Sequence, residues 1–351
     1  MTVNLAREAL KEVNAYESPR GEGLWLNANE YPETVPFALR EGLRMNYYPE
    51  MQSSALRKAY ADYAGVEPGQ VLIARGGDEA INVIVRTYCD AGDSYAYCPP
   101  TYSMYRAYGD IQGAKPVTCV TREADGFAVD ALAVQKAIDE GARLVFICSP
   151  NNPTGQFVPR ETFEAVLEAA RGRAMVVADE AYVEFNPERT LAGLLRDHDN
   201  LLVIRTLSKA FALAGLRCGF VLGNPEAVAS MGTVIDPYPV PVPVEDIALQ
   251  ALSATGVAAM CERAAKMRAN CEVLVRGLSE LPQVDRVFEA NANFALARFK
   301  DAQAVFARLA QDDIYVRDQR HMPGLANCLR ISVGTRSDIA RVLASIAAVP
   351  V

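Results

Sequence analysis

Short apolar runs alternate with helix-forming segments through the middle of this 351-residue chain, and no other feature constrains its fold as strongly. Five of these runs read as buried strands: residues 71–74, 94–97, 144–148, 175–178 and 201–204. Between them, residues 131–138 and 159–171 have the pattern of helices. Because nearly continuous apolar strands must be covered on both faces, the alternation predicts an α/β fold with a mostly parallel sheet.

A proline-rich segment follows this alternation. Residues 236–243 read Asp-Pro-Tyr-Pro-Val-Pro-Val-Pro, which should form neither a helix nor a central strand because proline has no amide hydrogen to donate. A long helical stretch then runs to about Leu281, followed by strand candidates at 293–299 and 328–333. We therefore expect a second, smaller α/β domain. The expected boundaries are 44–247 for the large domain, and 1–43 (an N-terminal arm) with 248–351 for the smaller one.

Composition narrows the class of protein. Half of the residues are hydrophobic, 22% are charged and the net charge is −8, which is typical of a soluble globular protein and gives no support to nucleic-acid binding. No run approaches the ~18 apolar residues of a membrane span, and Arg7 and Lys11 lie in a polar amphipathic segment unlike an export signal. Eight cysteines without a CxxC pair and only two histidines predict no metal site and free thiols in a reducing cytoplasm.

Polar clusters follow three of the apolar runs, at residues 149–155, 179–182 and 206–209. In a parallel sheet these strand ends meet at one edge, which is where ligands bind. The clusters contain a lysine and an acid, and Arg217 follows the lysine by eight residues. A lysine for the aldehyde, an acid for the ring nitrogen and an arginine for the phosphate are what pyridoxal 5'-phosphate (PLP) requires of a protein.

Lys209, Asp179 and Tyr182 are the candidate catalytic residues. Lys209 would bond through its amine to the aldehyde of PLP and then move the proton at the reacting carbon of the substrate. Asp179 would keep the ring nitrogen protonated, and Tyr182 would donate to the phenolic oxygen of the cofactor. The alternatives are a surface lysine and a turn or N-cap aspartate, although an unpaired carboxylate after a buried strand would be costly.

The cofactor's phosphate needs donors at the same edge, and the candidates are Gly77, Asp78, Ser208 and Arg217. Gly76 and Gly77 follow the strand 71–74 and precede a helix expected from about Ala80. Glycines let backbone N–H groups approach a phosphate at a helix N-terminus. A Gly-Gly pair alone is weak evidence for phosphate binding, so the assignment depends on Ser208 and Arg217.

Three further side chains are candidates for the site. Tyr102 follows a strand and could stack on the pyridine ring, or simply pack within its loop. Asn152 could bond to the phenolic oxygen, although Asn-Asn-Pro by itself signals only a turn. Arg330 interrupts an apolar strand, and a buried arginine needs an anionic partner. That partner is either a substrate carboxylate or a structural salt bridge.

Together these residues resemble the fold-type I, aspartate-aminotransferase-like enzymes that use PLP, and within them the chain is similar to the histidinol-phosphate aminotransferase family. The resemblance runs nearly end to end, through residues 26–30, 48–50, 98–102, 149–155, 178–185, 205–220 and 329–335. The Ser-Lys and Asp-x-x-Tyr elements are common to the superfamily, whereas segments 27–30 and 214–220 are more particular to this family. The resemblance implies a large domain with a mostly parallel, seven-stranded sheet and a smaller α/β domain.

The resemblance also implies an activity: reversible amino transfer between L-histidinol phosphate and 2-oxoglutarate, which becomes glutamate, in histidine biosynthesis. It implies an obligate homodimer in which Tyr48 reaches the PLP phosphate of the neighbouring subunit. Arg317 would bind the phosphate of the substrate, and Arg330 the α-carboxylate of glutamate. The substrate-contacting residues implied are Tyr16, Asn152, Arg317 and Arg330. Tyr47 stands where the family usually has arginine.

Other functions remain open from the sequence. A lyase resembling threonine-phosphate decarboxylase would share the fold and the cofactor site but release carbon dioxide. An aminotransferase with broad specificity for aromatic amino acids is also possible on this pattern. A non-catalytic, PLP-sensing transcription regulator would need a DNA-binding segment before the aminotransferase-like part, and here the site pattern begins too early in the chain.

Overall fold

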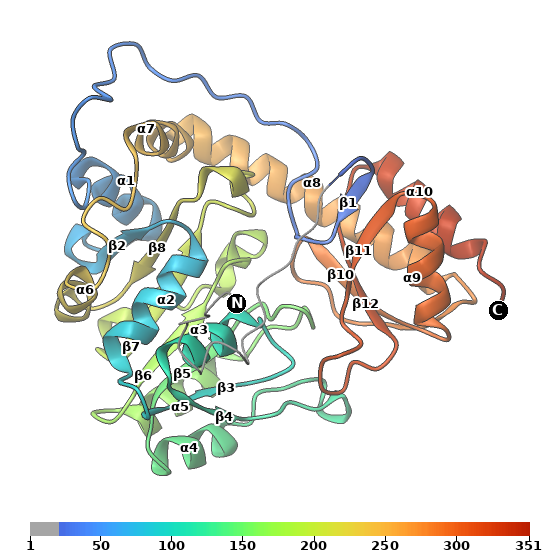
Figure 1. Ribbon diagram of the computed structural model, residues 1–351, viewed down its shortest axis with the longest axis horizontal. Helices are drawn as coiled ribbons and strands as arrows, with labels where there is room; N and C mark the ends of the chain where they lie inside the picture. Colours follow the sequence, from blue (N-terminus) through green and yellow to red (C-terminus); the bar gives the residue numbers. More distant parts are fainter. Residues whose placement is uncertain (1–20) are drawn as a thin grey trace, which may run out of the picture.

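The computed structural model describes residues 21–351, which form two sheets with helices packed around them (Figure 1). The larger sheet has seven strands within this range, in the order β2-β8-β7-β6-β5-β3-β4. Its strands are β2 (Val71–Ala74), β3 (Ser94–Tyr97), β4 (Lys115–Thr118), β5 (Ala142–Cys148), β6 (Met175–Asp179), β7 (Leu201–Thr206) and β8 (Gly219–Leu222). All neighbours pair in parallel except β8, which is antiparallel to both β2 and β7. The predicted mostly parallel, seven-stranded sheet is confirmed.

Both faces of the large sheet are buried, as its continuous apolar strands predict. Alternate residues of β5 enter different cores: Leu144 and Phe146 join one core, and Val145 and Ile147 join the other. Helices α2 (Gly77–Tyr88), α3 (Met104–Gln112) and α6 (Pro225–Gly232) contribute to the first core. The second core continues into the smaller sheet, and the helices that it receives from around the large sheet are α1 (Ser54–Ala64), α4 (Ala131–Asp139), α5 (Arg160–Ala170), α7 (Val242–Ala251) and α8 (Ala254–Ser279).

The smaller sheet is formed by the C-terminal part of the chain and one N-terminal strand, and Figure 1 shows the N-terminal strand in blue beside the orange and red ones. Its order is β1-β11-β12-β10-β9. The strands are β1 (Leu24–Leu26), β9 (Val284–Val287), β10 (Phe294–Phe299), β11 (Ile314–Asp318) and β12 (Cys328–Ser332). Helices α9 (Ala302–Gln311) and α10 (Arg336–Ala347) complete this unit, and α8 packs against β9, β10 and α10. The predicted boundaries of the two domains stay a prediction.

Short 3-10 helices occupy several connections of the chain. They are η2 (Pro68–Gln70), η3 (Glu123–Asp125), η4 (Val183–Phe185), η5 (Pro187–Arg189), η6 (Ala192–Arg196) and η7 (Ala214–Leu216). Within the described range, no helix is both long and apolar enough to cross a bilayer.

Three sequence-based expectations are corrected by the structure. Residues 242 and 243 belong to the first turn of α7, because a proline there needs no helical partner for its nitrogen. The long helical stretch after the prolines is two helices, broken between Ala251 and Ala254. Helix α2 begins at Gly77 and not at about Ala80, with Gly76 as its N-cap.

Candidate active site

A cavity of about 660 Å³ lies at the carboxyl ends of the large sheet's strands and reaches the smaller sheet. Most of the site residues predicted from the sequence line it. They are Gly77, Asp78, Tyr102, Asn152, Asp179, Tyr182, Ser208, Lys209, Arg217 and Arg330. All but Arg330, which belongs to β12, come from the large sheet, its helices or its loops. The structure thus brings together groups that are far apart in the sequence.

Lys209 lies just beyond β7, where its side chain is largely enclosed. Its Nζ donates a hydrogen bond to the backbone oxygen of Ala28 at 2.9 Å and lies 5.7 Å from the centroid of the Tyr182 ring. Burial, and then the positive charge of Arg330, lowers the pKa of Lys209 to about 8. About a tenth of this amine is therefore neutral at pH 7, and a neutral amine can act as a nucleophile or a base.

Asp179 is the last residue of β6 and is buried. Its Oδ2 accepts a hydrogen bond from the Tyr105 hydroxyl at 2.6 Å, and its Oδ1 accepts one from the Ala181 amide at 3.1 Å. Burial raises the pKa of Asp179 to about 6, although both hydrogen bonds oppose the rise. At this position a protonated nitrogen in the cavity would be a favourable partner, because its charge would offset the cost of a buried carboxylate.

The side chains of Tyr182, Asn152 and Arg330 form a connected polar group across the cavity. The Tyr182 hydroxyl accepts hydrogen bonds from Asn29 Nδ2 at 3.0 Å and from Asn152 Nδ2 at 3.4 Å. Arg330 Nη1 donates to Asn152 Oδ1 at 2.5 Å, and its Nη2 donates to the backbone oxygen of Asn27. Burial raises the pKa of Tyr182 well above its usual range, so its hydroxyl stays protonated and can donate to an oxygen in the cavity.

The N-terminus of α2 faces Arg217 and is suited to an anion. The N-cap, Gly76, has a φ of +88° and supplies no side-chain cap to the first amides of the helix. A Cβ at Gly76 would lie 2.9 Å from Arg217 Nη2, so only glycine lets the guanidinium pack this closely. Asp78 accepts from the Tyr102 hydroxyl at 2.8 Å and from Arg217 Nη2 at 3.3 Å. These contacts fix the two charged side chains beside the helix end.

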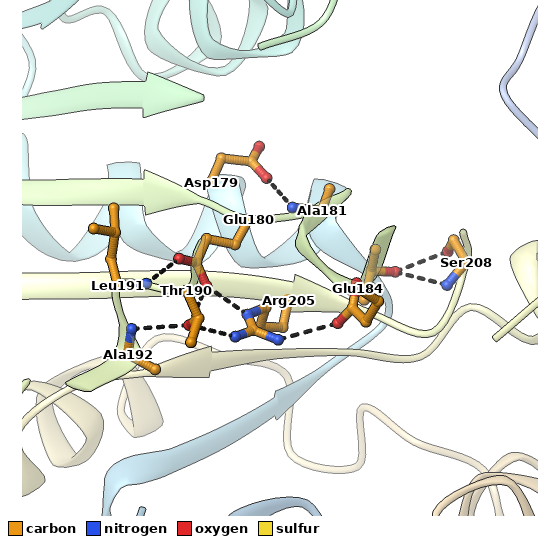
Figure 2. A network of polar contacts seen from close by, with 10 residues as sticks. Asp179, Glu180, Ala181, Glu184, Thr190, Leu191, Ala192, Arg205 and Ser208 are labelled. Carbon is orange, nitrogen blue, oxygen red and sulfur yellow. Dashed lines mark hydrogen bonds and ion pairs between the residues drawn. The ribbon is translucent and has the colours of Figure 1, made fainter. Parts of the chain in front are cut away.

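A buried ion-pair network lies next to the segments that carry Asp179 and Lys209, and it was not predicted from the sequence (Figure 2). Arg205 of β7 donates to Glu180 at 2.8 Å, to Glu184 at 3.1 Å and to Thr190 Oγ1 at 2.8 Å. It thereby ties the loop that follows Asp179 to the strand that leads to Lys209. The available signal was a charged residue directly after the apolar run 201–204, similar to the signal that pointed to Arg330.

Tyr105 was also missed, although it contacts Asp179 directly. Tyr102 precedes α3 and Tyr105 lies in its first turn, and the two rings meet edge-on with centroids 5.8 Å apart. The spacing of the two tyrosines was visible in the sequence, but nothing there indicated which carboxylate the second ring would meet.

Other predicted site residues lie outside the cavity. Tyr48 is 80% exposed and stacks on Tyr238, with ring centroids 4.4 Å apart. Arg317 is half-buried in β11, paired in register with Arg330 of β12, and does not line the cavity. Tyr16 lies outside the described residues. The roles of these three residues stay predictions.

The chain matches the family model for aminotransferases of class I and II over residues 21–346. It is 49% identical over 345 residues to a histidinol-phosphate aminotransferase of Cronobacter sakazakii, covering 97% of this chain and 94% of that relative. The corresponding Escherichia coli enzyme is 48% identical, with 97% and 96% covered.

Solved structures share the fold. A histidinol-phosphate aminotransferase from Sinorhizobium meliloti, solved in complex with PLP, superposes with a TM-score of 0.85 at 22% identity, covering 99% of this chain and 98% of that one. A variant of the Thermus thermophilus aspartate aminotransferase gives a TM-score of 0.81 at 22% identity, covering 99% and 100%. On the evidence of the family model and of relatives similar over nearly their whole length, this chain belongs to the class I and II aminotransferases.

Proposed function

We propose that this protein transfers an amino group reversibly between L-histidinol phosphate and 2-oxoglutarate, with PLP as its cofactor, in histidine biosynthesis. One observation carries the proposal: Lys209, with a pKa lowered to about 8, and the buried carboxylate of Asp179 line the same cavity. The two curated relatives named above are called histidinol-phosphate aminotransferases, which supports the choice of substrate.

The polar groups of the cavity fit those of PLP. Asp179 would hold the ring nitrogen, and the hydroxyl of Tyr182 with the amide of Asn152 would hold the phenolic oxygen. Arg217, Ser208 and the free amides at the start of α2 would hold the phosphate. The ring of Tyr102 would lie against the pyridine. When bound, PLP would supply an electron sink for negative charge that develops at the reacting carbon of the substrate.

The proton steps would fall to Lys209. With its Nζ free, Lys209 would remove the proton from the amino-bearing carbon of the substrate and, as a general acid, would deliver it to C4′, the aldehyde carbon of the cofactor. Its lowered pKa suits both directions, because general acid–base catalysis is most efficient when the pKa lies near the working pH. Asp179 would remain ionised while paired with the ring nitrogen.

Two arginines would recognise the two substrates. Arg330 would bind the α-carboxylate of glutamate, which suits a planar guanidinium. L-histidinol phosphate has no such carboxylate, and its phosphate would be bound by Arg317, while Tyr16 would also contact the substrate. Arg317 and Arg330 lie opposite each other on paired strands, which would place the phosphate site next to the carboxylate site.

The protein would act as a homodimer with shared active sites, in the cytoplasm. Tyr48 would extend from one subunit to the PLP phosphate of the other, and its 80% exposure within a single chain supports this. Other large apolar side chains of the same segment are exposed as well, as is Tyr238, on which Tyr48 stacks, and such exposure is typical of an interface between subunits: Leu39, Met45, Tyr47 and Met51.

A covalent-labelling experiment tests the cofactor assignment. Borohydride reduction of the PLP-loaded protein should attach the cofactor to Lys209, and peptide mapping should find it there. Lys209→Ala should bind PLP more weakly and lose transamination by on the order of 10⁴-fold or more, since it lacks both the nucleophile and the base. Label on a different lysine would contradict the assignment.

A substrate screen tests the reaction. Purified protein should form glutamate from 2-oxoglutarate and L-histidinol phosphate faster than from aromatic amino acids. Release of carbon dioxide from O-phosphothreonine, without glutamate, would instead identify the lyase. Equal rates with aromatic donors would identify a broad aromatic aminotransferase.

A further inference from the structure

We propose that Tyr105 is a positioning residue of the cofactor site, whose hydroxyl keeps Asp179 ionised and oriented for the ring nitrogen of PLP. This role rests on the proposed function, since it presumes that PLP is the cofactor. Tyr105 does not line the cavity, so it would act only through Asp179.

The Tyr105 ring is held firmly. The residue has no exposed surface and lies in the first turn of α3. Its ring stacks on Phe146 of β5, with centroids 4.8 Å apart and planes 10° from parallel, and it meets Tyr102 edge-on at 5.8 Å. Since a close-packed ring cannot turn without opening the core, the hydroxyl is fixed where it meets Asp179.

The carboxylate of Asp179 has one donor on each oxygen. The Tyr105 hydroxyl lies 2.6 Å from Oδ2, and the Ala181 amide lies 3.1 Å from Oδ1. Two fixed donors set the plane of the carboxylate, and each oxygen keeps further acceptor capacity. Because Asp179 also lines the cavity, a protonated ring nitrogen can pair with it there.

The other surroundings of Asp179 favour its neutral form. Burial contributes most to its raised pKa of about 6, and the charges of Asp78 and Glu180 add to the rise. The titratable groups that face it from the packed elements are Asp78, Tyr105, Cys148, Glu180 and Tyr182. Burial keeps Cys148 and Tyr182 uncharged, so neither adds to this repulsion. Loss of the Tyr105 hydroxyl should therefore keep Asp179 neutral up to a higher pH, and a neutral carboxyl holds a ring cation poorly.

The test is Tyr105→Phe, which keeps the ring and its stacking. The equilibrium binding of PLP to the apo-protein is measured from pH 5 to 9 without any substrate. A hydrogen bond to a charged group corresponds to roughly 10-fold to 100-fold in an equilibrium constant. We expect the acid limb of the binding profile to move upward by about one pH unit, so that PLP binds about twofold more weakly at pH 7 and about tenfold more weakly near pH 5.

Tyr95→Phe is the matched control. Tyr95 is also fully buried in the same core, but its hydroxyl contacts the backbone oxygen of Arg106 at 3.3 Å. Loss of the Tyr95 hydroxyl should leave the pH profile of PLP binding unchanged from that of the wild type. Lys209 should titrate identically in the wild type and in both variants. Coincident profiles for the two variants would overturn the role of Tyr105. Failure of the wild-type protein to bind PLP would instead contradict the proposed function.

A second variant covers the case in which Tyr105→Phe does not fold. Incorporation of 3-fluorotyrosine at position 105 keeps the shape of the side chain and makes its hydroxyl a stronger donor. The acid limb should then move downward, opposite to the direction for phenylalanine. The ¹⁵N chemical shift of the labelled ring nitrogen should show protonation persisting to a higher pH. An unmoved limb and an unchanged shift would overturn the proposal.

Discussion

Two arginines occupy otherwise apolar strands in this protein, and the structure gives them different surroundings. Arg205 of β7 donates to two carboxylates, those of Glu180 and Glu184 (Figure 2). Arg330 of β12 donates to two neutral oxygens, on Asn152 and Asn27, and its charge reaches Lys209, whose pKa it lowers. The same sequence signal therefore has two outcomes. Arg205 belongs to a structural ion-pair network behind the cavity, whereas Arg330 lines the cavity and its positive charge acts on the groups there.

The largest expected effect is a difference in the free energy of unfolding between variants of Arg205 and Arg330. Arg205→Ala would leave two buried carboxylates without their cation, which typically costs about 3–5 kcal/mol. Arg330→Ala should cost less, because it removes hydrogen bonds to two uncharged oxygens, those of Asn152 and Asn27, at the edge of the cavity. Urea unfolding of the apo-proteins measures both. Equal losses would break the comparison, since Arg330 would then be structural as well.

The next effect concerns the two anions of the substrates. Histidinol without its phosphate should react on the order of 10³-fold more slowly in kcat/KM, because a site built for a charged group rejects an analogue that lacks it. Arg317→Ala should erase most of this discrimination and spare the glutamate half-reaction. Arg330→Ala should do the reverse. Each half-reaction can be followed from the cofactor spectrum.

Equal damage to both half-reactions in both variants would contradict this division. Arg317 and Arg330 would then form a single anion site on the paired strands β11 and β12. Arg336→Ala is a suitable control, because this exposed arginine at the start of α10 donates to the backbone oxygen of Ala269 and does not line the cavity.

The sequence predicts the cofactor side of the cavity better than its other parts, for a physical reason. Lys209 and Asp179 follow apolar strands directly, and the parallel sheet brings such strand ends together whatever the helices do. The partners of Arg205 and Tyr105 depend on how a loop and a helix pack against those strands. No periodicity encodes that packing, so the ion-pair network and the Tyr105 contact required the structure.

The prolines at 236–243 give a second example. Their chemistry predicts a break in regular structure, and most of the segment is indeed irregular. The helix nevertheless begins at Val242, because the first turn of a helix tolerates proline and only its interior does not. Sequence rules located the break but not the residue at which the helix resumes.

A smaller effect tests whether the charge of Arg330 acts on Lys209. Arg330→Gln should raise the pKa of Lys209, because a positive neighbour is removed. The pH at which apo-protein reacts with PLP at half its maximal rate should therefore move upward, since the reaction needs the neutral amine. At pH 7 the rate should fall by up to about tenfold, the change produced by one pH unit. An unmoved midpoint would show that burial alone sets the pKa of Lys209.

The smallest effect concerns Tyr48, the most exposed of the predicted site residues that lie within residues 21–351. If it completes the neighbouring subunit's site, a mixture of Tyr48→Phe and Lys209→Ala proteins should regain activity above either parent. Random exchange in a symmetric dimer makes about half of the molecules hybrids, each with one intact site of two, so about a quarter of wild-type activity should return.

Subunit exchange is verified with differently tagged proteins, and a mixture of Lys209→Ala with Asp179→Ala serves as the control. Both of those side chains line the cavity of their own chain, so their hybrids have no intact site. Recovery of activity in the control mixture would show that the gain comes from contaminating active enzyme. No recovery with Tyr48→Phe after proven exchange would place Tyr48 outside the neighbour's site.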